Sequence, residues 1–275
     1  MDATSRQERA PLDCRGNDRT SERIGEAAGP ASSPLSLVVP IHGELAATQR
    51  FLESFERQTR PCPLLFVDDC SPDESVEWLR SRGWAVEVPP ERLWFNGIVN
   101  RALQVCRTPL LGILNNDLIL GRHFTELTIA AFERTTYDVL VARTVEAEDP
   151  AGLDRGGRFR IAPLWRREGW CMLFRVASIR RLPPIPDDLR LWYGDTWIFH
   201  HAWSSGMRVG IMLHNRIAHE GGRTIRAVQG QGTHPVIVSD ETAFRERYSW
   251  VQRRRSLGLL KLVPKPLRKI LLPYY

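Results

Sequence analysis

Short apolar runs alternate with amphipathic stretches through the first half of the chain. The runs over 35–40, 63–67 and 110–114 are almost wholly apolar, which is typical of strands buried on both faces of a sheet. Between them, segments such as 45–58 carry apolar residues at helical spacing. This alternation predicts an α/β fold with a doubly wound, mainly parallel sheet. The predicted strands are 35–40, 63–67, 84–88, 110–114, 138–145, 169–176 and 207–213, and the predicted helices are 45–58, 71–82, 96–106, 124–134 and 196–204.

One helix start has a specific signal. Ser71-Pro72-Asp73-Glu74 has the spacing of a capping box, with Ser71 as the N-cap and Pro72 at the first helical position. We expect this helix to end at Gly83, because glycine commonly follows the last turn of a helix.

Composition divides the 275-residue chain into four segments. Residues 1–33 are rich in Ser, Gly, Pro, Arg and Glu and are predicted to be disordered. Residues 34–145 form a first α/β half and 146–240 a second, less regular half, in which the polar stretch 146–167 reads as a mobile loop. Residues 241–275 form a basic amphipathic tail.

The formal net charge of +6 comes from the end of the chain. Seven of the 38 basic residues and no acidic residue lie in 251–275, so the remainder is close to neutral. No apolar run is long enough to span a bilayer, and the first residues lack the apolar core of a signal peptide. The five cysteines form no CxxC pair, so reduced and mostly buried thiols in a cytoplasmic protein are expected.

Polar residues follow three of the predicted strands at the point where each strand ends. Pro40 and His42 end the first strand, Asp68 and Asp69 the second, and Asn115-Asn116-Asp117 the strand 110–114. The carboxyl ends of parallel strands are where α/β sheets bind ligands. Because hard divalent cations take oxygen ligands from carboxylates and phosphates, a site for a metal and a phosphate is predicted. The chain has neither GxGxxG nor GxxxxGK[ST], so no glycine-rich loop would hold the phosphates.

Each of these residues also has a purely structural interpretation. Asp68, Asp69 and Asp73 fit an ordinary turn before a helix, and Asn115-Asn116-Asp117 fits a simple turn. Asp195 fits the N-cap of the helix 196–204. The aromatic residues of 165–197 are expected to pack in the core, with one or two lining a sugar cleft.

Five pieces in this order resemble family 2 glycosyltransferases of the glycosyltransferase-A fold. They are LSLVVPIHG, LLFVDDCSPDES, LLGILNNDLIL, WYGDTW and AHEGGRT, and they cover roughly 35–224. The rhamnosyltransferase-like branch, whose metal motif often reads Asn-Asn-Asp, is the most similar.

The resemblance implies a role for each matching residue. Asp69 would hydrogen-bond the nucleotide base beside Asp68, with Pro40 and His42 walling the base and ribose. Asn115, Asn116 and Asp117 match the DxD-type motif, in which Asp117 alone keeps a carboxylate and would bind Mg²⁺ or Mn²⁺. His219 would complete the metal shell or contact the diphosphate. Asp195 matches the catalytic base. Gly194 stands where the family usually has glutamate, and Trp197 stands where it often has a second acid.

The implied activity is an inverting, metal-dependent transfer of a hexosyl or deoxyhexosyl group in polysaccharide biosynthesis. The donor would be a nucleotide-diphosphate sugar and the acceptor a glycan or lipid-linked hydroxyl. The basic tail leaves two localisations open, free in the cytoplasm or peripheral on an anionic membrane surface. Two alternatives remain: a nucleotide-sugar-binding protein with impaired catalysis, suggested by Gly194, and a transferase acting on nucleic acid, suggested only by the tail.

Overall fold

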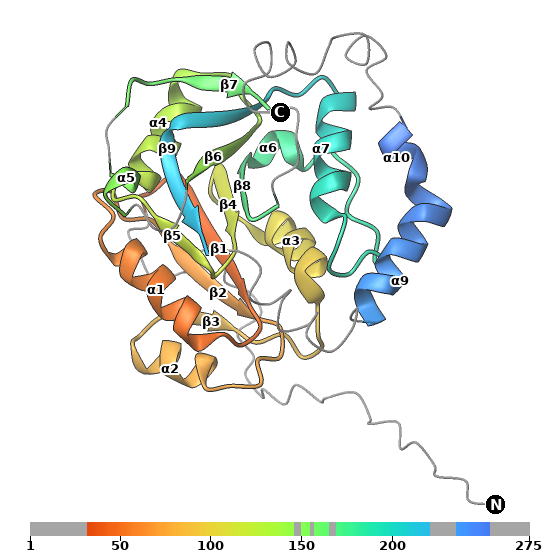
Figure 1. Cartoon of the computed structure of the whole chain (residues 1–275), viewed down its shortest axis with the longest axis horizontal. Coiled ribbons are helices and arrows are strands. Elements are labelled where there is room, and N and C mark those ends of the chain that lie inside the picture. Colours follow the sequence, from red (N-terminus) through yellow and green to blue (C-terminus); the bar gives the residue numbers. More distant parts are fainter. Residues whose placement is uncertain (1–31, 146–149, 155–156, 165–168, 221–234, 254–275) are drawn as a thin grey trace, which may run out of the picture.

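The structure is a computed structural model that describes residues 32–145, 150–154, 157–164, 169–220 and 235–253 (Figure 1). Its strands are β1 (Leu35–Ile41), β2 (Leu64–Asp68), β3 (Ala85–Glu87), β4 (Leu110–Leu114), β5 (Leu118–Leu120), β6 (Val139–Val145), β7 (Ile161–Pro163), β8 (Cys171–Arg175) and β9 (Val209–His219). Its helices are α1 (Leu45–Glu56), α2 (Ser75–Ser81), α3 (Trp94–Val105), α4 (Phe124–Arg134), α5 (Pro150–Leu153), α6 (Val176–Ile179), α7 (Gly194–Ser204), α9 (Pro235–Ala243), the π-helix η1 (Phe244–Tyr248) and α10 (Ser249–Arg253).

All the described strands belong to one sheet, in the order β3-β2-β1-β4-β8-β6-β9-β5, with β7 paired to β9 off this path. Strands β3, β2, β1 and β4 run parallel, as do β6 and β9. The predicted α/β class and mainly parallel sheet are therefore confirmed. Strand β8 runs antiparallel to both β4 and β6, a direction that its apolar run could not reveal.

Helices cover both faces of this sheet (Figure 1). Side chains alternate along β1: Leu37 and Val39 belong to the core under α1 and α4, whereas Val38 belongs to the core under α3 and α7. Each such buried aliphatic side chain stabilises the fold by about 1.5–3 kcal/mol. At the centre of β4, a Cβ on Gly112 would lie 2.5 Å from Leu37 Cδ2 and 2.9 Å from Leu173 Cδ2, so a larger residue would require these core leucines to move.

Helix α2 begins later than the capping-box pattern predicts. Its first residue is Ser75, and the Asp73 carboxylate accepts hydrogen bonds from Ser75 N at 3.1 Å and Ser75 Oγ at 2.6 Å. The Ser71 hydroxyl instead accepts one from Gly43 N at 2.7 Å, which joins the turns after β1 and β2. The assignment of Ser71 as N-cap and Pro72 as the first helical residue was therefore wrong, while the glycine end is confirmed by Gly83 at φ 80°.

The second half is more regular than its composition predicts. Strand β9 extends to His219, beyond the predicted end at residue 213, and its pairing with β6 shifts register between Ala142 and Arg143. Helix α5 and strand β7 lie within the stretch expected to be a loop. Strands of both predicted halves share the sheet, and the proposed boundaries stay a prediction. Residues 1–31 and 254–275 lie outside the described part, so the predictions for the N-terminal segment and most of the tail are not addressed there.

Cys62, Cys106 and Cys171 are buried and free, as expected for reduced core thiols. Burial raises the pKa of the Cys62 thiol to about 12. Cys70 departs from this expectation because it is disulfide-bonded. Among the described residues, no helix has both the length and the apolar character needed to cross a bilayer.

Candidate functional site

The carboxyl ends of β1, β2 and β4 meet at one edge of the sheet, as the sequence predicts. The last residues of β1 and β2 are paired, Ile41 with Asp68. One residue further, His42 Nδ1 lies 2.8 Å from the carbonyl oxygen of Asp69, whose amide donates to Ile41 O at 2.8 Å. After β4, the Asn116 amide donates to Thr48 Oγ1 at 3.0 Å and so fixes the turn against α1.

Asp69 is a buried carboxylate with partners on both oxygens. Its Oδ1 accepts from Trp94 N at 2.8 Å and its Oδ2 from Arg92 Nε at 3.0 Å. Burial raises the pKa of Asp69, while the hydrogen bond and charge of Arg92 oppose that rise. The Arg92 guanidinium lies 3.6 Å from the Trp94 ring centroid. Each carboxylate oxygen still has a second lone pair, so Asp69 can also accept a hydrogen bond from a ligand.

The neighbours of Asp69 are less specialised. The Asp68 carboxylate accepts from Ser71 N at 3.1 and 3.3 Å, which is the turn-forming role that composition alone suggested. Pro40 is half-buried within β1 opposite Val67, and His42 is exposed. His42 and Asp69 therefore lie together at this edge of the sheet, and Asp68 shapes the turn that follows β2.

Asp117 and His219 meet at the ends of β5 and β9. Leu118 pairs with His219, and the Asp117 Oδ2 to His219 Nε2 distance is 3.2 Å. Asp117 is 9% exposed, and its Oδ1 has no hydrogen-bond partner within the described residues. A buried carboxylate oxygen without a partner lowers the stability of the folded protein, so we expect this atom to contact a cation or a hydrogen-bond donor from outside the protein.

Neighbouring residues hold this pair in place. Glu220 N donates to Asp117 O at 3.1 Å, and the Glu220 carboxylate forms a bidentate ion pair with Arg50 of α1, 2.5 Å at its shorter contact. The Trp170 ring stacks on His219 with centroids 5.1 Å apart, and its indole N–H donates to Thr144 Oγ1. The two side chains are therefore preorganised.

The Asp117 carboxylate fits Mg²⁺ or Mn²⁺, since both prefer oxygen ligands, whereas the His219 imidazole nitrogen is a ligand that Mg²⁺ seldom takes. In the described ranges, no group of three or more His, Cys, Asp and Glu side chains is placed to hold a metal. A cation bound by Asp117 and His219 would thus complete its coordination with water and substrate phosphate, as Mg²⁺ commonly does in nucleotide sites.

Asp195 lies on the same side of the molecule as Asp117. A Cβ on Gly169 would be 3.2 Å from Asp195 Cβ, and Gly169 directly precedes the Trp170 that stacks on His219. Helix α7 begins at Gly194 with Tyr193 as N-cap, so Asp195 lies in the first turn and not at the N-cap position. Its Oδ1 accepts from Thr196 N at 2.5 Å, and a negative charge is favourable at this end of a helix.

The space next to Gly194 is already filled. A Cβ at this position would come within 1.9 Å of Asn96 Oδ1 and 2.6 Å of Asn96 Cγ. Asn96 is 1% exposed and donates from Nδ2 to Leu189 O at 2.8 Å and Trp192 O at 3.0 Å. A glutamate at position 194 would therefore collide with a fixed side chain, which explains physically why this chain has glycine there.

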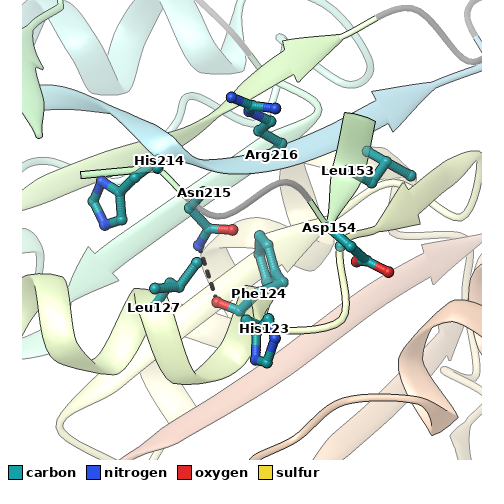
Figure 2. A pocket seen from close by; sticks show the side chains of 10 residues that line it. His123, Phe124, Leu127, Leu153, Asp154, His214, Asn215 and Arg216 are labelled. Carbon is teal, nitrogen blue, oxygen red and sulfur yellow. Dashed lines mark hydrogen bonds between the residues drawn. The ribbon is translucent and has the colours of Figure 1, made fainter. Parts of the chain in front are cut away.

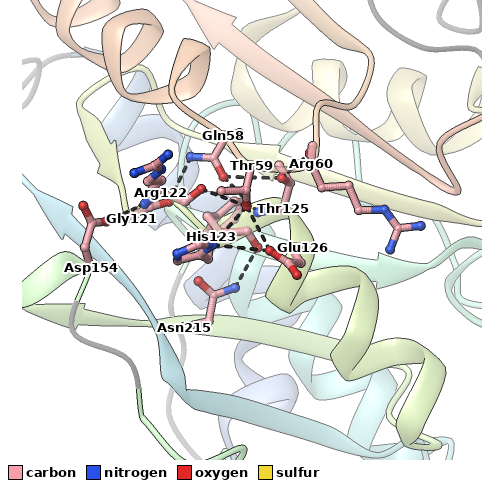
Figure 3. Close-up of polar contacts among 11 residues, drawn as sticks. Gln58, Thr59, Arg60, Gly121, Arg122, His123, Thr125, Glu126, Asp154 and Asn215 are labelled. Carbon is pink, nitrogen blue, oxygen red and sulfur yellow. Dashed lines mark hydrogen bonds and ion pairs between the residues drawn. The ribbon is translucent and has the colours of Figure 1, made fainter.

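A separate pocket lies between β9 and the start of α4, away from these residues (Figure 2). It is lined by Gly121, His123, Phe124, Leu127, Leu153, Asp154, Gly157, His214, Asn215 and Arg216. Beside it, Gln58 donates to Gly121 O at 2.9 Å and accepts from Thr125 N at 3.0 Å (Figure 3). This network ties the end of α1 to the β5–α4 turn and contains none of the predicted site residues.

A family model, described as glycosyl transferase family 2, matches residues 36–204. The chain belongs to glycosyl transferase family 2. The predicted family is thereby confirmed, and the narrower rhamnosyltransferase-like resemblance stays a prediction. A search of curated protein sequences gives no match.

Solved structures show the same fold for this family 2 glycosyltransferase chain. S. aureus TarS (1–349) matches with a TM-score of 0.55 and 15% identity over 74% of this chain and 64% of that one. GalNAc-T7, solved with UDP, GalNAc and Mn²⁺, matches with a TM-score of 0.54 and 13% identity over 67% of this chain and 42% of that one. The chain thus spans less than two thirds of these proteins, and the likeness confirms the glycosyltransferase-A fold.

Several residues of the site were not predicted. Arg92 and Trp94 on Asp69, Arg50 on Glu220, and Asn96 beside Gly194 lie in no motif and have no distinctive spacing in the sequence. Their partners are distant in the chain, so only the folded structure brings them together.

Proposed function

We propose that this chain transfers a hexosyl or deoxyhexosyl group from a nucleotide-diphosphate sugar to an acceptor hydroxyl, with inversion at the anomeric carbon. The observation that carries the proposal is the unpartnered, buried Oδ1 of Asp117 beside His219, on the same side as Asp195. In this proposal, Asp69 would contact the base of the donor, the Asp117–His219 pair would hold the cation on its diphosphate, and Asp195 would take the acceptor proton.

The donor nucleotide would lie across the ends of β1, β2 and β4. Asp69 would accept a hydrogen bond from the base, with Pro40 and His42 beside the base and ribose and Asp68 shaping the turn. Asn115 and Asn116 would line the diphosphate next to Asp117. The buried state of Asp69 supports this role, because a hydrogen bond to a ligand is stronger where water is excluded.

Asp117 and His219 would hold Mg²⁺ or Mn²⁺ on the diphosphate. Such an ion supplies electrostatic stabilisation of the negative charge that develops on the leaving group. The chain's own contribution is to fix the two ligands: Trp170 orients the imidazole, and the Arg50–Glu220 pair holds the residue after His219.

Asp195 would act on the acceptor. As the acceptor oxygen forms a bond to the anomeric carbon, the bond from that carbon to the diphosphate oxygen breaks, and the Asp195 carboxylate takes the acceptor proton. A single displacement of this kind inverts the anomeric configuration. General-base assistance contributes about 10²–10⁴-fold, and holding donor and acceptor in line contributes much of the rest.

The acceptor class that fits best is a glycan or lipid-linked hydroxyl, as in polysaccharide biosynthesis. The basic C-terminal segment supports a cytoplasmic protein that works at an anionic membrane surface.

Turnover of a panel of nucleotide-diphosphate sugars, with and without Mn²⁺, tests the proposal. We expect Asp195→Asn to lower sugar release by at least about 100-fold and to leave nucleotide binding intact. Wild-type release by both Asp195→Asn and Asp117→Asn would refute it. Binding of UDP or another nucleotide diphosphate without release from any donor would favour the impaired protein, and transfer to DNA or RNA alone would favour the nucleic-acid enzyme.

A further inference from the structure

We infer that Asp240, on helix α9, is a positioning residue that sets the placement of Asp195 by holding the backbone of residues 190–192. The inference rests on the proposed role of Asp195 as the base. Asp240 is distant from Asp195 in the sequence and belongs to no motif, so its role comes from the geometry alone.

The Asp240 side chain is fully buried, with 0% exposure. Its Oδ1 accepts from Arg190 N at 3.1 Å, and its Oδ2 accepts from Leu191 N and Trp192 N, both at 2.7 Å. Three successive backbone N–H groups therefore converge on one carboxylate. Such an arrangement is an anion-binding concavity of the backbone, and hydrogen bonds of this kind are short and strong.

The same segment is held from its other side by α3. Asn96 N donates to Arg190 O at 2.9 Å, and the Asn96 side chain donates to Leu189 O and Trp192 O. The backbone amides of 190–192 thus donate to Asp240, and the carbonyl oxygens of three residues in 189–192 accept from Asn96. These hydrogen bonds replace the helix or strand pairing that the segment lacks.

The segment leads directly into the proposed base. Trp192 is followed by Tyr193, at φ 63°, and then by Gly194 and Asp195 in the first turn of α7. The Tyr193 ring stacks on Phe244 of η1 with centroids 4.1 Å apart. A shift of the 190–192 backbone would therefore pass to Asp195 within three residues, with no flexible linker between them.

Packing of α9 does not require a carboxylate at this position. Burying one costs several kcal/mol unless its hydrogen bonds compensate, and an apolar residue would bury α9 without that cost. What the carboxylate adds is a fixed conformation of a segment without regular structure. A misplacement of about 1 Å far from the reacting atoms can lower a rate by about 10²-fold.

The test compares Asp240→Asn and Asp240→Glu with a control variant, Glu241→Gln. The control makes the same carboxylate-to-amide change one residue further along α9, where Glu241 forms an ion pair with Arg245. Asparagine presents an N–H to a backbone N–H, and glutamate moves the carboxylate by one methylene. For both Asp240 variants we expect kcat per nucleotide-binding molecule to fall about 10- to 100-fold, with donor KM and the Kd for UDP unchanged within about twofold. Glu241→Gln should match the wild type.

Trypsin cleavage after the exposed Arg190, located by mass spectrometry, should be faster in the Asp240 variants and unchanged in Asp195→Asn.

Normalising kcat to nucleotide-binding molecules separates positioning from misfolding, because a purely structural defect lowers the number of active molecules and not the rate of each. If either folded Asp240 variant keeps the wild-type kcat while Asp195→Asn is inactive, the inference is overturned and the proposed function stands. If Asp195→Asn keeps the wild-type rate, the proposed function is refuted, and this inference, which rests on it, is refuted as well.

Discussion

His219 and Asp117 face each other across the ends of β9 and β5, with 3.2 Å between Nε2 and Oδ2. His219 ends β9, which belongs to the second half of the chain, and Asp117 lies in the turn after β4. The pair therefore forms only when strands of both halves share the sheet. The second oxygen of Asp117 is buried and has no partner among the described residues. This relationship identifies the position at which we propose that the chain binds a cation.

Asp117→Asn should abolish the metal-dependent part of nucleotide binding. In the wild type, UDP with Mn²⁺ at about 100 times its dissociation constant should add about 2.7 kcal/mol to the free energy of unfolding. We expect Asp117→Asn to lose that increment and His219→Ala to lose part of it, measured by thermal unfolding with and without Mn²⁺. Glu126→Gln, a change at an exposed carboxylate of α4, is the control. A full Mn²⁺-dependent shift in Asp117→Asn would exclude this residue as a ligand.

Gly194→Glu, which introduces the acid usual in the family, should destabilise this chain. Its Cβ would overlap Asn96 Oδ1, and overpacking costs about 1–3 kcal/mol. Asn96→Gly should relieve the overlap, so the double variant should be less destabilised than the sum of the single changes by about 0.5–3 kcal/mol in urea unfolding. Gly157→Ala is the control, since its Cβ would meet only atoms at 3.7 Å. Additive effects would show that the two positions are independent.

Arg92→Gln should move the pH range over which the nucleotide binds. Burial raises the pKa of Asp69 and Arg92 lowers it, so removing the guanidinium should raise that pKa further. Because the ionised carboxylate is the acceptor, binding should weaken as pH falls through the pKa, and at a higher pH in Arg92→Gln than in the wild type. Calorimetric titration with UDP over a range of pH measures the midpoint of binding for the wild type and for Arg92→Gln. The difference between the two midpoints does not depend on the titration of the UDP phosphate, which is common to both. Arg101→Gln, which affects the ion pair with Glu87, should leave the midpoint in place.

His214 should make stability fall in mild acid. Burial lowers its pKa below the ordinary value of 6.5, and the contact of its Nδ1 with Arg160 O at 2.9 Å only partly opposes that shift. The unfolded chain therefore binds this proton more readily, and the contribution of His214 is complete above pH 6.5 and is lost as pH falls through the folded pKa. Urea unfolding from pH 8 to pH 5 should show a slope of up to about 1.4 kcal/mol per pH unit from this group. His214→Gln should flatten that slope, whereas the exposed His123→Gln should not.

The parallel strands were predictable because each is a compact apolar run followed by polar residues, as in β1, β2 and β4. The extent of β9 was not, because His214 and Asn215 interrupt its apolar pattern where the pairing with β6 shifts register. The start of α2 was misassigned because two residues of one turn, Ser71 and Asp73, both carry capping side chains, and tertiary contact with Gly43 decides between them.

The residues implied by the family resemblance could be named from the sequence because they lie in short motifs. Asn96 and Asp240 were not, because each acts on the backbone of a distant segment, which leaves no pattern in the order of residues. The side-chain roles assigned to Asp69, Asp117, Asp195 and His219 stay predictions until the variants are measured.

The first turn of α3 binds two regions at once: Trp94 donates its amide to Asp69, and two residues later Asn96 donates its amide to Arg190 O. Because these two contacts lie two residues apart in one helical turn, holding Asp69 also holds the Arg190 carbonyl, whereas the Arg190 amide depends on Asp240. A nucleotide seated against Asp69 would therefore steady the segment that leads to Asp195 before any acceptor arrives. Steady-state kinetics should accordingly show compulsory order, with the sugar donor as the leading substrate.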